Sequence, residues 1–160
     1  MKNMTHTELV ELVKYYKLDD LTGLMQRKDL FEFVTKKIKA NSFFCLSMVD
    51  VDNLHMVNRR DGMKAGDNLI KSVSNSLISI FGLESVYRYG GDEFIIVHNI
   101  ENVDGLLSNM DNITFATVPF IGIHTTFSEI FKEVDKALIK DKCKKPSGNC
   151  VYRGHFCAKE

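Results

Sequence analysis

The sequence predicts an α+β fold: an α/β sandwich in which helices flank a central antiparallel sheet, in the ferredoxin-like, palm-type order βαββαβ. Three observations support this prediction. The run 43–49 is almost wholly apolar and is bounded by polar residues, as in a central strand covered on both faces. Gly90 and Gly91 separate two short strand-like segments, which is typical of a tight hairpin. Segments with helical periodicity follow the first strand and the hairpin.

Composition restricts the class of protein before any motif is considered. The chain has 160 residues, 44% of them apolar and 26% charged, and its net charge is zero. These values are typical of one globular domain and give no reason to expect nucleic acid or an anionic membrane surface as a partner. No apolar run approaches the roughly 20 residues that span a bilayer, and residues 1–14 are too polar for a signal peptide. We therefore expect a cytoplasmic protein.

Residues 1–18 predict an amphipathic helix that extends a domain at residues 19–160. Thr5 and Glu8 fit a capping box at its start. Apolar residues then recur at helical spacing, at Leu9, Leu12, Val13 and Tyr16. We expect this helix to pack onto the domain rather than to drive self-association, because three turns cannot form a stable coiled coil alone.

Two further helices are expected around the central strand. The stretch 19–31 is a polar turn that enters the first of them, whose apolar face carries Leu30, Phe33, Val34 and Ile38. The second runs from about Ala65 to Phe81 and turns Leu69, Val73, Leu77 and Ile80 inward.

The hairpin strands are expected at Tyr87–Tyr89 and Phe94–Val97. Glycine at both central turn positions allows a positive φ without steric strain. A short helix near Val103–Met110 follows the hairpin.

The C-terminal third predicts two strands, one helix and an edge strand. The strands, Ile113–Val118 and Ile121–Thr125, are expected to be separated at Pro119. The helix at 127–142 has an apolar face formed by Ile130, Phe131, Val134, Ala137 and Leu138. Residues 151–156 are expected to add the edge strand.

The four cysteines indicate reduced thiols rather than a zinc site. Cys45 lies inside the apolar run 43–49, where a small buried thiol is expected. Cys143, Cys150 and Cys157 lie near the C-terminus without the two-to-four-residue spacing of zinc knuckles.

Acidic residues from two distant segments are expected to meet at one edge of this sheet. In the βαββαβ order the first strand lies beside the hairpin, so Asp50 would sit close to Asp92 and Glu93. Like charges so close are costly unless a cation neutralises them, and oxygen-only ligands select Mg²⁺ or Mn²⁺. The alternative is an ordinary hairpin whose turn happens to be acidic.

Four motifs occur along residues 19–142. They are DDLTGL at 19–24, DVD at 50–52, an N-x8-D pair formed by Asn58 and Asp67, and GGDEF at 90–94. With these motifs in this order, the chain resembles the GGDEF family of diguanylate cyclases, which join two GTP molecules into cyclic di-GMP. The resemblance implies the sheet of the nucleotidyl cyclases.

The resemblance also implies roles for individual residues. Two Mg²⁺ or Mn²⁺ ions would be held by Asp50, Asp92 and the backbone carbonyl of Val51, and Glu93 would contribute to the same acidic site. Asp92 would help to deprotonate the attacking hydroxyl.

The same resemblance assigns the substrate contacts. Asn58 and Asp67 would read guanine, because a carboxylate accepts from N1–H and the 2-amino group while an amide pairs with O6 or N3. Amides around Asn53 and Leu54 would hold the β- and γ-phosphates, and Lys142 would reach the triphosphate.

The implied chemistry needs two subunits. The 3′-hydroxyl of one GTP attacks the α-phosphate of the other, pyrophosphate leaves, and two metal ions stabilise the charge. Each subunit holds one GTP, so both bonds form only in a homodimer. No sensor segment is recognisable, so two expectations stay open: a stand-alone enzyme controlled by concentration or by a separate regulatory protein, or a fragment.

Several positions depart from the family pattern. His55 stands where a lysine is usual, Met63 where a histidine is usual, and Pro146 where an arginine follows Lys142 by four residues. These changes weaken phosphate binding without touching the expected metal ligands. Arg59 and Gln26 replace an aspartate and an asparagine. Phe81 and Glu84 replace the usual arginine and aspartate of the product-inhibition motif, so no feedback inhibition is expected through that motif.

Three functions stay open from the sequence. The retained acids favour an active diguanylate cyclase. His55, Met63 and Pro146 favour a weak or inactive GTP-binding or dimerisation module of the same fold. A related nucleotidyltransferase that makes another cyclic nucleotide is the third, and Asp67 argues against it because a carboxylate repels the N1 acceptor of adenine.

Overall fold

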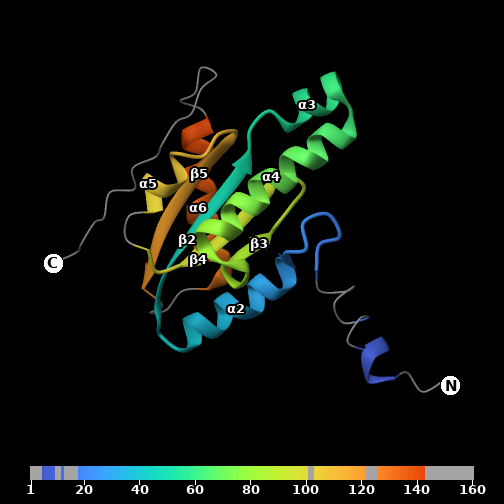
Figure 1. Cartoon of the computed structure of the whole chain (residues 1–160). Helices are drawn as coiled ribbons and strands as arrows, with labels where there is room; N and C mark the ends of the chain where they lie inside the picture. The colour runs from blue at the N-terminus through green and yellow to red at the C-terminus, as the bar shows by residue number, and fades with distance from the viewer. Residues whose placement is uncertain (1–4, 10–11, 13–17, 101–102, 122–125, 143–160) are drawn as a thin grey trace.

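The computed structural model describes residues 5–9, 12, 18–100, 103–121 and 126–142, which include a five-stranded sheet with helices on both faces (Figure 1). The strand order is β1-β3-β4-β2-β5. The strands are β1 (Met25–Gln26), β2 (Phe43–Val51), β3 (Val86–Arg88), β4 (Glu93–His98) and β5 (Ile113–Ile121). The longer helices are α2 (Arg27–Lys39), α3 (Leu54–Asp61), α4 (Met63–Phe81) and α6 (Phe127–Lys142); shorter ones are α5 (Val103–Leu107) and the 3₁₀ turn η1 (Leu83–Ser85). The α+β prediction is confirmed.

The sheet is mixed rather than purely antiparallel. β2 pairs antiparallel with β4 and β5, and β3 pairs antiparallel with β4. The two-residue strand β1 pairs parallel with β3, Met25 opposite Tyr87 and Gln26 opposite Arg88. This strand was not predicted, because two residues are too short to show a period.

Alternate side chains of β2 point into two hydrophobic layers, one on each face of the sheet. Val49 and Val51 face one layer, which α4 covers, and Leu46 and Met48 face the other, which α2 and α6 cover (Figure 1). The predicted faces of the covering helices are buried in these layers, at Leu30 and Val34 of α2, Val73 and Leu77 of α4, and Ile130, Val134 and Leu138 of α6. Cys45 is also buried, as predicted, at 3% exposure.

Proline does not interrupt β5. Two strands separated at Pro119 were predicted, but β5 continues through that residue to Ile121, with Pro119 opposite Cys45. β5 ends the strand order of the described sheet, where a residue without an N–H is tolerated. The predictions for residues 122–125 and 151–156, and for Cys143, Cys150 and Cys157, fall outside the described residues.

The turn glycines do not adopt the predicted conformation. Neither Gly90 nor Gly91 has a positive φ, whereas Gly23, Gly62 and Gly82 do, at 70°, 87° and 81°. The turn is also wider than a two-residue hairpin, because β3 ends at Arg88 and β4 begins at Glu93.

The N-terminal capping box forms, and two of the predicted apolar residues beyond it are exposed, while Val13 and Tyr16 lie outside the described residues. The amide of Thr5 donates to Glu8 Oε2 at 2.7 Å, and the amide of Glu8 donates to Thr5 Oγ1 at 3.3 Å. Leu9 and Leu12 are 50% and 40% exposed, so the prediction that this face packs onto the domain is wrong for these two residues. None of the described helices has the length and apolar character needed to cross a bilayer.

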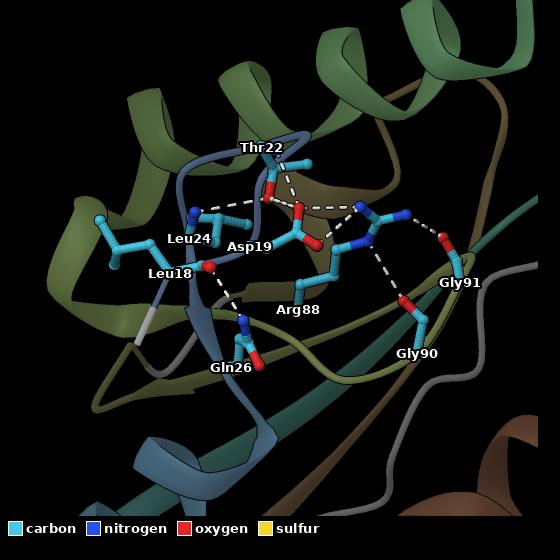
Figure 2. Close-up of polar contacts among 8 residues, drawn as sticks. All are labelled: Leu18, Asp19, Thr22, Leu24, Gln26, Arg88, Gly90 and Gly91. Carbon is cyan, nitrogen blue, oxygen red and sulfur yellow. Dashed lines mark hydrogen bonds and ion pairs between the residues drawn. The ribbon is translucent and has the colours of Figure 1, made fainter. Parts of the chain in front are cut away.

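Arg88 fastens the hairpin to the loop that precedes β1. Its Nη1 donates to both carboxylate oxygens of Asp19, at 2.9 and 2.7 Å, while its Nε and Nη2 donate to the carbonyls of Gly90 and Gly91, at 3.2 and 2.7 Å (Figure 2). Asp19 also accepts from the amide and hydroxyl of Thr22, at 2.8 and 2.7 Å. One guanidinium therefore fixes the turn of the hairpin; we call this set of contacts the Arg88 clamp.

The clamp keeps Asp19 ionised. Burial opposes the charged form, but the hydrogen bonds from Arg88 and Thr22 and the guanidinium charge outweigh it and lower the pKa of Asp19. The stabilisation is therefore present above the ordinary carboxylate pKa and is lost as the pH falls through the lowered value.

A chain of polar side chains, buried at His98 and Ser47, crosses β4, β2 and β5. His98 Nε2 lies 2.9 Å from Ser47 Oγ, which lies 2.7 Å from Thr117 Oγ1. The amide of Ile100 donates to His98 Nδ1 at 3.1 Å, so the neutral ring carries its proton on Nε2 and donates to Ser47. Burial lowers the pKa of His98 to about 4, and the imidazole stays neutral.

Asp19→Asn should lower the free energy of unfolding by about 2 kcal/mol at pH 7, because the half-buried guanidinium of Arg88 loses its charged partner. Urea unfolding measures the change. Asp61→Asn is the matched control, since it breaks an exposed pair with Arg60 and should leave stability unchanged. Equal effects of the two substitutions would contradict a structural role for the clamp.

The His98 imidazole should make stability depend on pH between about 6.5 and 4. In this window the unfolded chain binds a proton at this residue and the folded chain does not, so stability falls with falling pH, on the order of 3 kcal/mol. Urea unfolding of wild type and His98→Gln at several pH values isolates this contribution. His6→Gln, at an exposed histidine, should show the same dependence of unfolding free energy on pH as wild type. The assignment would be refuted if His98→Gln also kept the wild-type dependence.

Candidate functional site

The β2–β4 register brings the acids of two distant segments together. Asp50 lies opposite Glu93 in the antiparallel pair, and the amide of Val51 donates to the carbonyl of Asp92 at 2.9 Å. Asp50 is 7% exposed, whereas Asp92 and Glu93 are half-buried. Residues about forty positions apart in the chain thus share one end of the sheet, as the predicted topology requires.

Gly90 is needed at this end for space. The amides of Tyr89 and Gly90 both donate to the carbonyl of Glu93, at 2.8 and 3.2 Å, which folds the turn back on β4. A Cβ on Gly90 would lie 2.9 Å from Glu93 Oε2. A larger residue would therefore displace the carboxylate that follows the turn.

The second aspartate of the DVD motif secures the start of β5. Asp52 accepts a hydrogen bond from the hydroxyl of Thr114, and its amide donates to the carbonyl of Asn112 at 2.8 Å. No role was predicted for Asp52. Its partners lie some sixty residues further along the chain, and no local pattern points to them.

The segment after β2 makes a sharp turn into α3. Asn53 is left-handed, with φ 59°, and its carbonyl accepts from the amide of Val57 at 3.0 Å. Asn53 places no side-chain cap on α3, so its side chain does not cover the first amides of this helix, the group predicted to hold phosphates. His55 on the first turn of α3 is exposed, and Met63 at the start of α4 is 69% exposed.

Asn58 lies on α3 and Asp67 on α4, the two helices that meet at Gly62. Gly62, with φ 87°, ends α3 and caps α4, so the two helices turn back on each other. Asn58 Oδ1 is buried and has no hydrogen-bond partner. A Cβ at Gly66 would lie 1.9 Å from that oxygen, so only glycine leaves room for the amide.

The remaining predicted residues lie at the margins of this region. Lys142 is the last residue of α6, and its side chain is outside what the structure describes. Phe81 packs against the core with its ring 5.6 Å from that of His98, and Glu84 is exposed on η1.

The donor chemistry near Asp50 suits a hard cation. Within the described residues, no three His, Cys, Asp or Glu side chains converge as a ready-made metal cage. The predicted set needs only two carboxylates, Asp50 and Asp92, with a backbone carbonyl, and oxygen donors are those that Mg²⁺ and Mn²⁺ prefer. The residues present therefore fit such an ion.

The chain matches a family model and several curated proteins. The family model described as "Diguanylate cyclase, GGDEF domain" matches residues 16–114. "Probable diguanylate cyclase DgcI" of Escherichia coli is 32% identical over 111 residues, which cover 68% of this chain and 25% of the relative. "Diguanylate cyclase DgcP" of the same organism is 35% identical over 92 residues, covering 54% and 27%. The chain thus spans about a quarter of the length of these curated relatives.

Solved structures share the fold at lower identity. The coiled coil and GGDEF domain of DgcB from Caulobacter crescentus, in complex with c-di-GMP, superposes with a TM-score of 0.74 at 19% identity, covering 86% of each chain. The diguanylate cyclase SiaD from Pseudomonas aeruginosa, in complex with its activator SiaC, gives 0.72 at 21%, covering 84% of this chain and 61% of SiaD. Since the family model matches more than half of the sequence, this chain belongs to the GGDEF domain family of diguanylate cyclases.

Proposed function

We propose that this domain is a diguanylate cyclase that condenses two GTP molecules into cyclic di-GMP and pyrophosphate across a homodimer. The observation that carries the proposal is the junction of β2 and β4, where Asp50 lies opposite Glu93 and Val51 is hydrogen-bonded to Asp92. A domain without this chemistry has no evident need for three carboxylates at one end of a sheet.

The metal ligands in this proposal are Asp50, Asp92 and the backbone carbonyl of Val51. When bound there, two Mg²⁺ or Mn²⁺ ions lower the pKa of an attacking hydroxyl and stabilise charge on phosphate oxygens. Asp92 accepts the proton of the 3′-hydroxyl, and Glu93 adds negative charge that holds the cations.

Asn58 and Asp67 read the base. Asn58 lies on α3, which turns at Gly62 into the helix that carries Asp67, and its side-chain amide would donate to O6 or N3 of guanine. The Asp67 carboxylate accepts from N1–H and the 2-amino group of guanine. The amides near Asn53 and Leu54, with Lys142, bind the phosphates.

Two subunits are needed because each holds one base and one triphosphate. The two phosphodiester bonds form between nucleotides bound on facing subunits, so a symmetric dimer is the active species. SiaD is recorded in complex with its activator SiaC, which supports a separate regulatory protein as one way of controlling this dimer.

An inactive GTP-binding module of the same fold is the second candidate. Met63, 69% exposed at the start of α4, cannot donate a hydrogen bond to a nucleotide, and His55 stands where the family usually has a lysine. Such a module would bind GTP without releasing pyrophosphate.

Incubation with GTP and Mg²⁺ should yield cyclic di-GMP and pyrophosphate, identified by mass spectrometry and a phosphate-release assay. Binding of GTP without pyrophosphate would instead support the inactive module. Turnover of ATP would support a nucleotidyltransferase with another product.

Asp92→Ala should lower the rate of cyclic di-GMP formation at least a hundredfold while the far-ultraviolet circular dichroism spectrum is retained. The substitution removes a carboxylate that binds metal and accepts the proton. Glu133→Gln, at an exposed acid on α6, serves as the control for a lost negative charge. Full activity of Asp92→Ala would refute the assignment.

Gly66→Ala should weaken binding of GDP, which carries the same base but lacks the pyrophosphate leaving group, at least tenfold by isothermal titration calorimetry. The new methyl group would occupy the space of the Asn58 amide, 1.9 Å from its oxygen. The test is a double-mutant cycle with Asn58→Ala. In the Asn58→Ala background, Gly66→Ala should lower the affinity for GDP less than twofold. Additive effects of the two substitutions on this affinity would show that Gly66 acts independently of Asn58.

A further inference from the structure

The described part of the molecule has a hollow that is lined by aromatic and basic side chains. It has a volume of about 750 Å³ and lies between the first turns of α2 and α6, beside Tyr89 of the hairpin. Its lining is Gln26, Arg27, Lys28, Phe31, Tyr89, Phe127, Ser128, Phe131 and Lys132. We call it the aromatic pocket; none of the residues proposed to bind GTP or metal lines it.

Four aromatic rings line this pocket. Tyr89 and Phe131 are stacked with ring centroids 4.4 Å apart, and Phe131 stacks on Phe127 at 5.8 Å. Phe31 meets Phe127 edge-on at 5.1 Å and is 51% exposed. Exposure of such a ring costs free energy in water, so the ring is available to a planar ligand.

The charge of the pocket has one sign. Arg27, Lys28 and Lys132 line it, and the described lining contains no acid. The guanidinium of Arg27 lies 4.6 Å from the centre of the Tyr89 ring, which keeps the positive charge at the aromatic surface. Outside the lining, Glu129 interacts with Lys132, and Glu93 and Asp135 lie close enough to influence the Tyr89 hydroxyl, so the excess of positive charge belongs to the lining itself. A neutral ligand would gain nothing from that charge, whereas an anion would pair with it.

We propose that the aromatic pocket binds a planar aromatic anion of about the size of a mononucleotide. The rings provide a stacking platform, the three cations pair with the anionic group, and the volume lies within the range of small-ligand sites. The proposal does not depend on cyclase activity.

The dye 8-anilinonaphthalene-1-sulfonate is a suitable probe, because it is a planar aromatic anion without guanine or phosphate. N-phenyl-1-naphthylamine has the same rings and no sulfonate, so comparison of the two isolates the anion. Fluorescence titration without nucleotide or Mg²⁺ should show one dye per chain and at least fivefold tighter binding of the sulfonate.

Two variants should alter this binding in different ways. Phe31→Ser, at an exposed ring, should weaken both dyes at least fivefold, whereas the double variant Arg27→Gln, Lys132→Gln should weaken only the sulfonate. The matched controls on α6 are Ile139→Ser and Lys140→Gln, which are exposed and lie outside the pocket lining; both should bind like wild type.

The proposal fails if the charge variant binds the sulfonate as tightly as wild type, or if the neutral dye binds wild type equally well. It also fails if Phe31→Ser leaves both affinities unchanged, since the dye then lies elsewhere. Because no nucleotide is present, a failed cyclase assay would not affect this result.

Discussion

The guanidinium of Arg88 joins two segments that are distant in the sequence: the loop before β1 and the turn of the hairpin. On one side it pairs with Asp19, before β1, and on the other it holds the carbonyls of Gly90 and Gly91 (Figure 2). The position of this turn determines where the following acids lie, which is next to Asp50. The DDLTGL and GGDEF motifs are therefore parts of one structural unit. The Arg88 side chain links them by hydrogen bonds to both.

Periodicity predicted the elements that bury one face. The helix at 127–142 and the central strand at 43–49 were predicted because their apolar residues repeat or run together, and both are buried as expected. The continuity of β5 through Pro119 could not be predicted, since whether a strand lies at the edge of a sheet depends on its neighbours. The prediction of positive φ angles at Gly90 and Gly91 was wrong, because glycine permits a positive φ without requiring it.

The meeting of Asp50 with the hairpin acids followed from topology, because adjacent antiparallel strands place one end of the first beside the turn of the second. Contacts that depend on side-chain shape did not follow. The bond between Asp52 and Thr114, and the space that Gly66 leaves for Asn58, join residues whose types occur everywhere in proteins. Only the folded arrangement distinguishes these pairs from chance combinations.

Helix α3 has a thermodynamic consequence for ligand recognition. None of its eight residues is fully buried, and it is bounded by left-handed Asn53 and by Gly62. Few apolar contacts hold it, so its amides should exchange with solvent through local opening well before those of α4. Ordering of α3 then becomes part of the free energy of nucleotide association, and the measured affinity would be lower than the contacts alone imply.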